Sequence, residues 1–195
     1  MNFTVREIRD LTIAWLALGL AFALFFNRVS PPMLPAFLTS NAFLVAMAIS
    51  LVTVGVGFLL HELAHKVVAV HYGQYAVFKA DYGFLALAVA GGLAGVIFAA
   101  PGAVYHRGRL TDAQHGHIAV AGPLTNLGLA VVFAALTYVT PEIGARGVQI
   151  NLLLAGFNML PVGGLDGRTV LDWSTPIYVA VTVPSVLLAA SVLLF

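Results

Sequence analysis

The chain has 195 residues, of which 61% are hydrophobic and only 9% are charged, and its formal net charge is +1 at pH 7. A soluble globular domain carries about 25% charged residues, so this composition excludes a soluble domain or a disordered chain and predicts an integral membrane protein. The low net charge offers no electrostatic surface for nucleic acid. The absence of cysteine excludes disulfides, thiolate metal sites and iron–sulfur clusters.

Six stretches without charged residues are candidate membrane segments, because the hydrocarbon core needs about 20 mainly apolar residues as a helix. They are residues 11–26, 42–60, 84–100, 118–139, 148–165 and 176–195. Their apolar residues run continuously and do not alternate, which predicts helices. The first stretch is also compatible with a signal peptide, but its leader balances two arginines against two acids, so we interpret it as a short transmembrane helix.

Residues 75–82 lie between two glycines and are rich in β-forming side chains, which predicts a short interfacial strand or hairpin. We therefore predict an all-α polytopic membrane bundle with about five spanning helices, one re-entrant or interfacial apolar segment and this strand. Residues 1–195 are expected to form a single membrane domain with a core at about residues 42–170. The flanking helices are then residues 11–26 and 176–195.

The second apolar stretch runs into His61-Glu62-Leu63-Ala64-His65. Positions i and i+4 share one face of a helix, so both imidazoles can bind one zinc ion. Glu62, beside the first imidazole, can act as a general base on water. A packed polar patch is the structural alternative. Ionisable residues at membrane depth are costly, however, and three within five positions indicate a functional site.

A catalytic zinc ion usually has three protein ligands, so a third is expected outside this motif. Asp166 is the strongest candidate, because Pro161, Gly163 and Gly164 break the helix just before it and would let the carboxylate turn inwards. The alternative is a helix-end turn whose carboxylate faces the interface. The weaker candidates lie at a helix end or in polar surroundings: His71, His106, His115, His117, Asp172 and Asp81.

The chain contains three motifs whose sequence and order resemble those of the site-2 protease family of intramembrane zinc metalloproteases. They are HELAH at 61–65, AGPLTN at 121–126 and NMLPVGGLDG at 158–167, and the resemblance covers about residues 42–170. It implies one zinc ion held by His61, His65 and Asp166, with Glu62 as the catalytic base.

The same resemblance gives roles to two asparagines. It implies that Asn158 holds the substrate strand or the developing oxyanion. Asn126 is a second candidate for substrate binding, and hydrogen bonding between helices is its alternative role.

The predicted zinc site also constrains the topology. If His65 and Asp166 both end their helices, these helices must be parallel, so one of the two intervening apolar segments does not cross the membrane. Residues 84–100 contain three glycines and precede Pro101-Gly102, so we expect this segment to bend back.

Basic residues support the same arrangement. Five spans with the N-terminus inside give seven basic residues inside and two outside, as the positive-inside rule favours. We therefore predict a multi-pass cell-membrane protein with its site towards the cytoplasmic side. The inside residues are Arg6, Arg9, Lys66, Lys79, Arg107, Arg109 and Arg168, and the outside residues are Arg28 and Arg146.

The resemblance predicts a zinc metalloendopeptidase that cleaves transmembrane protein substrates within the lipid bilayer, with Glu62 as general base. An extended substrate could pair with the edge of strand 75–82. Nucleic acid is not an expected partner, and the sequence leaves the oligomeric state open. A divalent-metal transporter or channel is the alternative, because buried His and carboxylates also line ion pathways. An inactive homologue is a third reading, against which the intact Glu62 argues.

Overall fold

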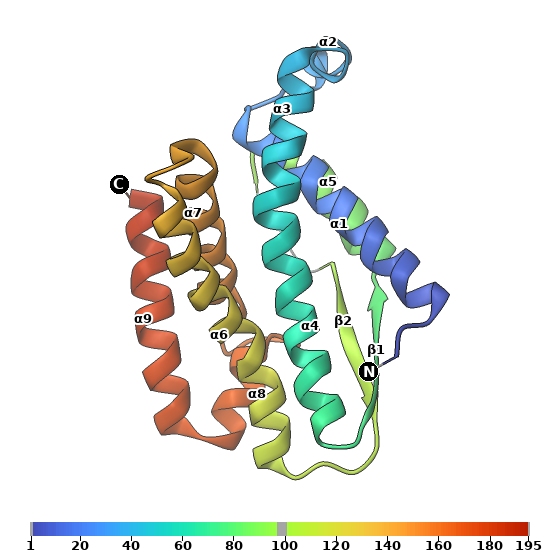
Figure 1. Cartoon of the computed structure of the whole chain (residues 1–195), viewed down its shortest axis with the longest axis vertical. Coiled ribbons are helices and arrows are strands. Elements are labelled where there is room, and N and C mark those ends of the chain that lie inside the picture. The colour runs from blue at the N-terminus through green and yellow to red at the C-terminus, as the bar shows by residue number, and fades with distance from the viewer. Residues whose placement is uncertain (1, 97–100, 195) are drawn as a thin grey trace. The chain divides into compact units, whose positions relative to one another are not determined.

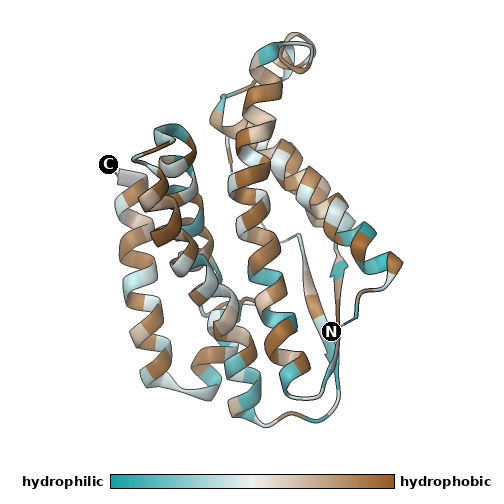
Figure 2. Cartoon of the chain, in the orientation of Figure 1, coloured by the Kyte–Doolittle hydropathy of each residue, from teal (hydrophilic) through white to brown (hydrophobic). Residues whose placement is uncertain are grey.

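Helices dominate the fold of the protein, which a computed structural model describes for residues 2–96 and 101–194 (Figure 1). The predicted helical membrane fold is confirmed: four described helices are long and apolar enough to cross a membrane. They are Val5–Phe26, Asn41–His71, Asp112–Leu136 and Thr175–Val192. Figure 2 shows apolar residues along the length of these helices, with polar residues at helix ends and in the lower part of α4 (Val56–His71).

The chain forms two compact units, one of Asn2–Val56 with Phe78–Tyr105 and one of Gly57–Val77 with His106–Phe195. Helices of the first unit are α1 (Val5–Phe26), η1 (Pro31–Met33), α2 (Leu34–Leu38), α3 (Asn41–Ser50), the π-helical turn η2 (Leu51–Gly55) and α5 (Tyr82–Ala94). The second unit holds most of α4 together with α6 (Asp112–Leu136), α7 (Pro141–Asn158), α8 (Asp166–Trp173) and α9 (Thr175–Leu194).

The predicted strand at 75–82 is confirmed as β1 (Tyr75–Ala80), which pairs with β2 (Gly102–Arg107) in a two-stranded antiparallel sheet. β2, which follows the apolar stretch 84–100, was not predicted from the sequence.

Two buried carboxylates of α1 form hydrogen bonds with β1 and with the first residue of α5. Glu7 accepts a hydrogen bond from the Phe78 backbone N–H at 3.0 Å, and Asp10 accepts one from the Tyr82 hydroxyl at 2.7 Å. An extended substrate that paired with β1 at Phe78 would have to displace Glu7.

The apolar stretch 84–100 lies between the two strands in the sequence. Its described part, α5, has 13 residues. A helix of that length measures about 20 Å, less than the ~30 Å hydrocarbon core. The Asp81 N–H donates to the Pro101 carbonyl at 2.9 Å, so the segment starts and ends at hydrogen-bonded neighbours. This geometry supports a non-crossing excursion, although residues 97–100 lie outside the described part.

Two exposed tyrosines on the flanking strands provide a test of this topology. Tyr75 and Tyr105 are 63% and 59% exposed, and the chain has no cysteine of its own. Tyr75→Cys and Tyr105→Cys are each expected to react with a membrane-impermeant thiol reagent from the same side of the membrane, which we predict to be cytoplasmic. Labelling of the two variants from opposite sides would show that residues 84–100 cross.

In the second unit, α6 packs against α7 and α8, and α9 covers α7 and α8. A buried cluster of Ala119, Val120, Met159 and Val170 joins α6 to α8 and to the end of α7. The indole of Trp173 lies where a side chain at Gly116 would otherwise stand. These contacts fix α8, and with it Asp166, against α6.

The predicted segment 148–165 is displaced in the structure. Helix α7 begins at Pro141, whose fixed φ suits a first turn, and ends at Asn158, three residues before Pro161. We expected Asp166 to end a helix, and this prediction was wrong. Asp166 instead begins α8, after a loop. This removes the premise of the parallel-helix argument. The hydrogen bond between Asp81 and Pro101 supports the non-crossing segment independently.

Candidate metal centre

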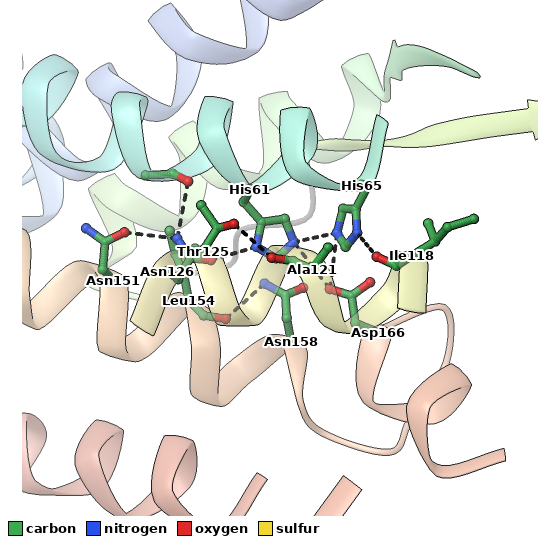
Figure 3. Close-up of polar contacts among 11 residues, drawn as sticks. His61, His65, Ile118, Ala121, Thr125, Asn126, Asn151, Leu154, Asn158 and Asp166 are labelled. Carbon is green, nitrogen blue, oxygen red and sulfur yellow. Dashed lines mark hydrogen bonds and ion pairs between the residues drawn. The ribbon is translucent and has the colours of Figure 1, made fainter. Parts of the chain in front are cut away.

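Two imidazoles and one carboxylate meet in the second unit (Figure 3). His61 and His65 lie one turn apart on α4, and their Nε2 atoms are 2.9 Å apart. Asp166 Oδ2 lies 3.2 Å from His61 Nε2 and 3.4 Å from His65 Nε2. Of the described residues, these three form the group whose ligand atoms all lie within 4.8 Å of one another and could hold a metal ion.

The far nitrogen of each ring fixes where the lone pairs point. His65 Nδ1 lies 2.7 Å from the Ile118 carbonyl oxygen, which can only accept, so this nitrogen carries a proton. His61 Nδ1 lies 2.6 Å from Asn126 Oδ1, which also accepts. In the neutral rings both Nε2 atoms therefore present lone pairs to Asp166. A shared cation would compensate the repulsion among three such atoms, and outer partners of this kind are typical of histidines that bind metal.

The loop before α8 delivers Asp166 to this position. Gly163 has a positive φ of 57°, which favours glycine. A side chain at Gly167 would collide with the Met159 carbonyl, so the glycine lets the first turn of α8 pack on the end of α7. Burial works to raise the pKa of Asp166, but the positive charge that His65 and His61 carry when they are protonated outweighs it and holds the pKa well below its usual range. The carboxylate is therefore ionised at neutral pH, as a metal ligand must be.

Two further observations fit a metal ion. Buried oxygen atoms of Asp166 and Glu62 (Oδ2 and Oε2) make no hydrogen bond. Such atoms are costly unless something else compensates their burial. A Cβ atom at Gly122 of α6 would lie 2.5 Å from the Nε2 atoms of both His61 and His65. The glycine thus leaves open the space in front of the two nitrogens, and the residues present fit a bound divalent cation.

Asn126 and Asn151 lie behind His61. Asn126, on α6, is fully buried, and its amide nitrogen donates to the Gly57 carbonyl at 3.2 Å and to Asn151 Oδ1 at 2.9 Å. Asn151, on α7, is also fully buried and donates to the Gly147 carbonyl at 2.9 Å. Asn151 was not among the residues predicted from the sequence, although an asparagine within a charge-free apolar stretch is a usable signal, since such residues pair with polar groups on other helices.

Asn158 lies two turns beyond Asn151 on the same face of α7. It is half-buried, and its amide donates to the Leu154 carbonyl of its own helix at 2.9 Å. In the view of Figure 3 its side chain lies between Leu154 and Asp166. No hydrogen bond from Asn158 to His61, His65 or Asp166 is present among the described residues.

The weaker candidates for a third ligand have other contacts. The His117 ring bonds to the Tyr72 hydroxyl at 2.6 Å and packs against Trp173. Asp172 pairs with Arg168 at 3.0 Å. Asp81 accepts from the N–H groups of Gly83 and Phe84 at the start of α5. The candidates that do not join the metal-binding group are His71, His106, His115, His117, Asp172 and Asp81.

The sequence of the chain is similar to that of a known protein whose name is consistent with a metal site. The chain is 41% identical over 191 residues to the protein named "Putative zinc metalloprotease MJ0611" of Methanocaldococcus jannaschii, and the match covers 94% of this chain and 92% of that protein. The chain belongs to this zinc metalloprotease family. No protein-family model and no solved structure matches it.

Membership in a metalloprotease family gives the cluster a chemical context. Two histidines and a carboxylate form a donor set that zinc takes in catalytic sites, where a fourth position is left for water or substrate. In this metalloprotease the set lies beside a buried glutamate that follows the first histidine directly.

Proposed function

We propose that this metalloprotease is an intramembrane enzyme of the site-2 type, which cleaves transmembrane protein substrates with one zinc ion bound by His61, His65 and Asp166. The observation that carries the proposal is the meeting of these three ligands on buried helix faces of a membrane protein. A zinc ion held there would supply Lewis-acid chemistry, which polarises a peptide carbonyl and acidifies water. These three metal-binding residues lie together at one place. A transport pathway would need polar residues spread across the membrane, so the grouping favours hydrolysis over transport.

Glu62 is the proposed general base. Its buried Oε2 has no hydrogen-bond partner and is free to accept a proton. Glu62 takes the proton of the attacking water as the oxygen bonds to the carbonyl carbon. It returns this proton to the amide nitrogen as the C–N bond breaks, so the products are a carboxyl group and an amine. Asn158 is the proposed hydrogen-bond donor to the substrate carbonyl, for which its amide would turn away from Leu154.

The remaining parts of the proposal concern the setting. The protein is a multi-pass protein of the cell membrane, and its site opens towards the cytoplasmic side, where water is available for hydrolysis. Substrate helices must unwind to expose a peptide bond, so helix-breaking glycine or proline in a substrate span should favour cleavage.

A comparison of wild type with Glu62→Gln tests this function. The probes are purified single-span fusion proteins that carry glycine or proline in the span, and each protease preparation is also analysed for zinc. Glu62→Gln is expected to keep its zinc and to lose about 10²–10⁴ of the cleavage rate, because a general base typically contributes that much. Glu142→Gln, at the exposed start of α7, is the matched control and should retain both. Equal cleavage by wild type and Glu62→Gln would refute the proposed role.

A further inference from the structure

Three buried hydrogen bonds lead from a backbone carbonyl of α7 to the first histidine of the motif, and Figure 3 shows those that join Asn151, Asn126 and His61. They run from Asn151 to Gly147, from Asn126 to Asn151 and from His61 to Asn126, with lengths of 2.9, 2.9 and 2.6 Å. Both asparagines are 0% exposed, so water cannot replace any of these partners. The oxygen of Asn151 faces Asn126, and the oxygen of Asn126 faces Nδ1 of His61.

The direction of every bond in this chain is forced. The Gly147 carbonyl can only accept, so the amide nitrogen of Asn151 must face it, and the Asn151 oxygen must face Asn126. Asn126 then presents its nitrogen to Asn151 and to the Gly57 carbonyl, another group that only accepts. Its oxygen is left for His61, so the Nδ1 atom of His61 must carry the proton.

We propose that Asn151 is a positioning residue: it holds the Asn126 amide in the orientation that keeps a proton on His61 Nδ1 and so directs the Nε2 lone pair at the metal position. This inference rests on the proposed metal site, which it deepens. It assigns a role to a residue outside the three sequence motifs. It also gives Asn126 a place behind the ligand, whereas the resemblance suggested contact with substrate.

Replacing Asn126 and replacing Asn151 should lower the zinc affinity by different amounts. Without Asn151, the Asn126 amide keeps one of its two acceptors, the Gly57 carbonyl, and rotates more freely. Without Asn126, His61 Nδ1 loses the side-chain partner that it has among the described residues, and both tautomers become accessible. Loss of an outer partner of a metal-bound histidine typically costs about 10–100-fold in metal affinity. We expect such a loss for Asn126→Leu and a smaller one for Asn151→Leu.

The test uses the full chain in detergent micelles and has two readouts. The first is the ¹⁵N NMR spectrum of histidine-labelled, metal-free protein at a pH where the rings are neutral, which reports the tautomer of His61. The second is zinc affinity, measured by competition with a chelator. Wild type is expected to show a proton on Nδ1, and Asn151→Leu is expected to show a mixture of tautomers and weaker zinc binding.

Two control variants separate positioning from packing. Asn151→Asp is isosteric, and a protonated carboxyl at this buried position can donate to Gly147 and accept from Asn126, so it should restore the wild-type tautomer. Gln149→Leu removes an amide elsewhere on α7, one that donates to the Val192 carbonyl, and should change neither readout. Asn151→Ala replaces Asn151→Leu if the larger side chain prevents folding.

A wild-type tautomer together with unchanged zinc affinity in Asn151→Leu or Asn151→Ala would overturn the inference. A wild-type protein that binds no zinc would instead refute the proposed metal site. The two failures are distinguishable, because the tautomer is read in metal-free protein.

Discussion

Replacing Asp166 by asparagine is expected to abolish zinc binding and cleavage together. Asp166 is the only carboxylate in the described metal-binding group, and its Oδ2 lies within 3.4 Å of both imidazoles. An amide oxygen is a neutral and much weaker ligand, and two histidines alone leave the ion one protein ligand short. The loss of zinc affinity should exceed the 10–100-fold that is typical of losing an outer partner.

Asp172→Asn is the matched control for this experiment. Asp172 lies on the same short helix, α8, and its exposed carboxylate pairs with Arg168. The control should keep its zinc and its cleavage rate, as measured by metal analysis and by cleavage of the same fusion proteins. His61→Ala and His65→Ala should behave like Asp166→Asn, and His71→Ala should behave like the control. Zinc retained by Asp166→Asn but lost from His71→Ala would identify a different third ligand.

Replacing Gly122 by alanine should also prevent zinc binding, although Gly122 has no side chain to act as a ligand. The added methyl group would lie 2.5 Å from His61 Nε2 and His65 Nε2. Zinc binds imidazole nitrogen at about 2.0–2.1 Å, so the methyl group and the ion compete for nearly the same space. We expect zinc affinity to fall at least ~100-fold, more than an outer-partner variant loses. Overpacking typically costs another ~1–3 kcal/mol of stability.

Gly128→Ala on the same helix is the control. Gly128 is exposed, and a Cβ atom there would have no neighbour within 4 Å. This variant should bind zinc as wild type does, and thermal unfolding measured beside zinc affinity separates a blocked site from a misfolded one. Wild-type zinc affinity in a folded Gly122→Ala protein would show that the ion does not lie between these two nitrogens.

The residues of the site were more predictable than the backbone that carries them. His61 and His65 are four apart, and a helix through them follows from the apolar run alone. Asp166 followed from the resemblance and from the helix breakers before it. Its position at the start of α8 did not, because a Pro/Gly break shows where a helix cannot continue and says little about where the next begins.

Other features depend on contacts between distant segments. β2 has six residues, as β1 has, and its pairing with β1 is a contact between distant segments that local composition does not reveal. Asn151 gains its role from Asn126, 25 residues earlier in the chain. Helix α7 includes Glu142 and Arg146 in its first turns, so a search for charge-free stretches placed its start too late. Local composition therefore indicates that these segments are apolar or polar, but it does not show which distant segment they contact.

The position of Asp166 after a loop has a consequence for the assembly of the second unit. The two histidines come together as soon as α4 forms, since they belong to one helix. The carboxylate lies about 100 residues further along, so joining it to them closes a long loop, at an entropic cost that grows only slowly with length. The proposed ion would then act as a reversible cross-link that ties α8 to α4 and encloses α6 and α7. Metal uptake would thereby complete the folding of this unit as well as its chemistry.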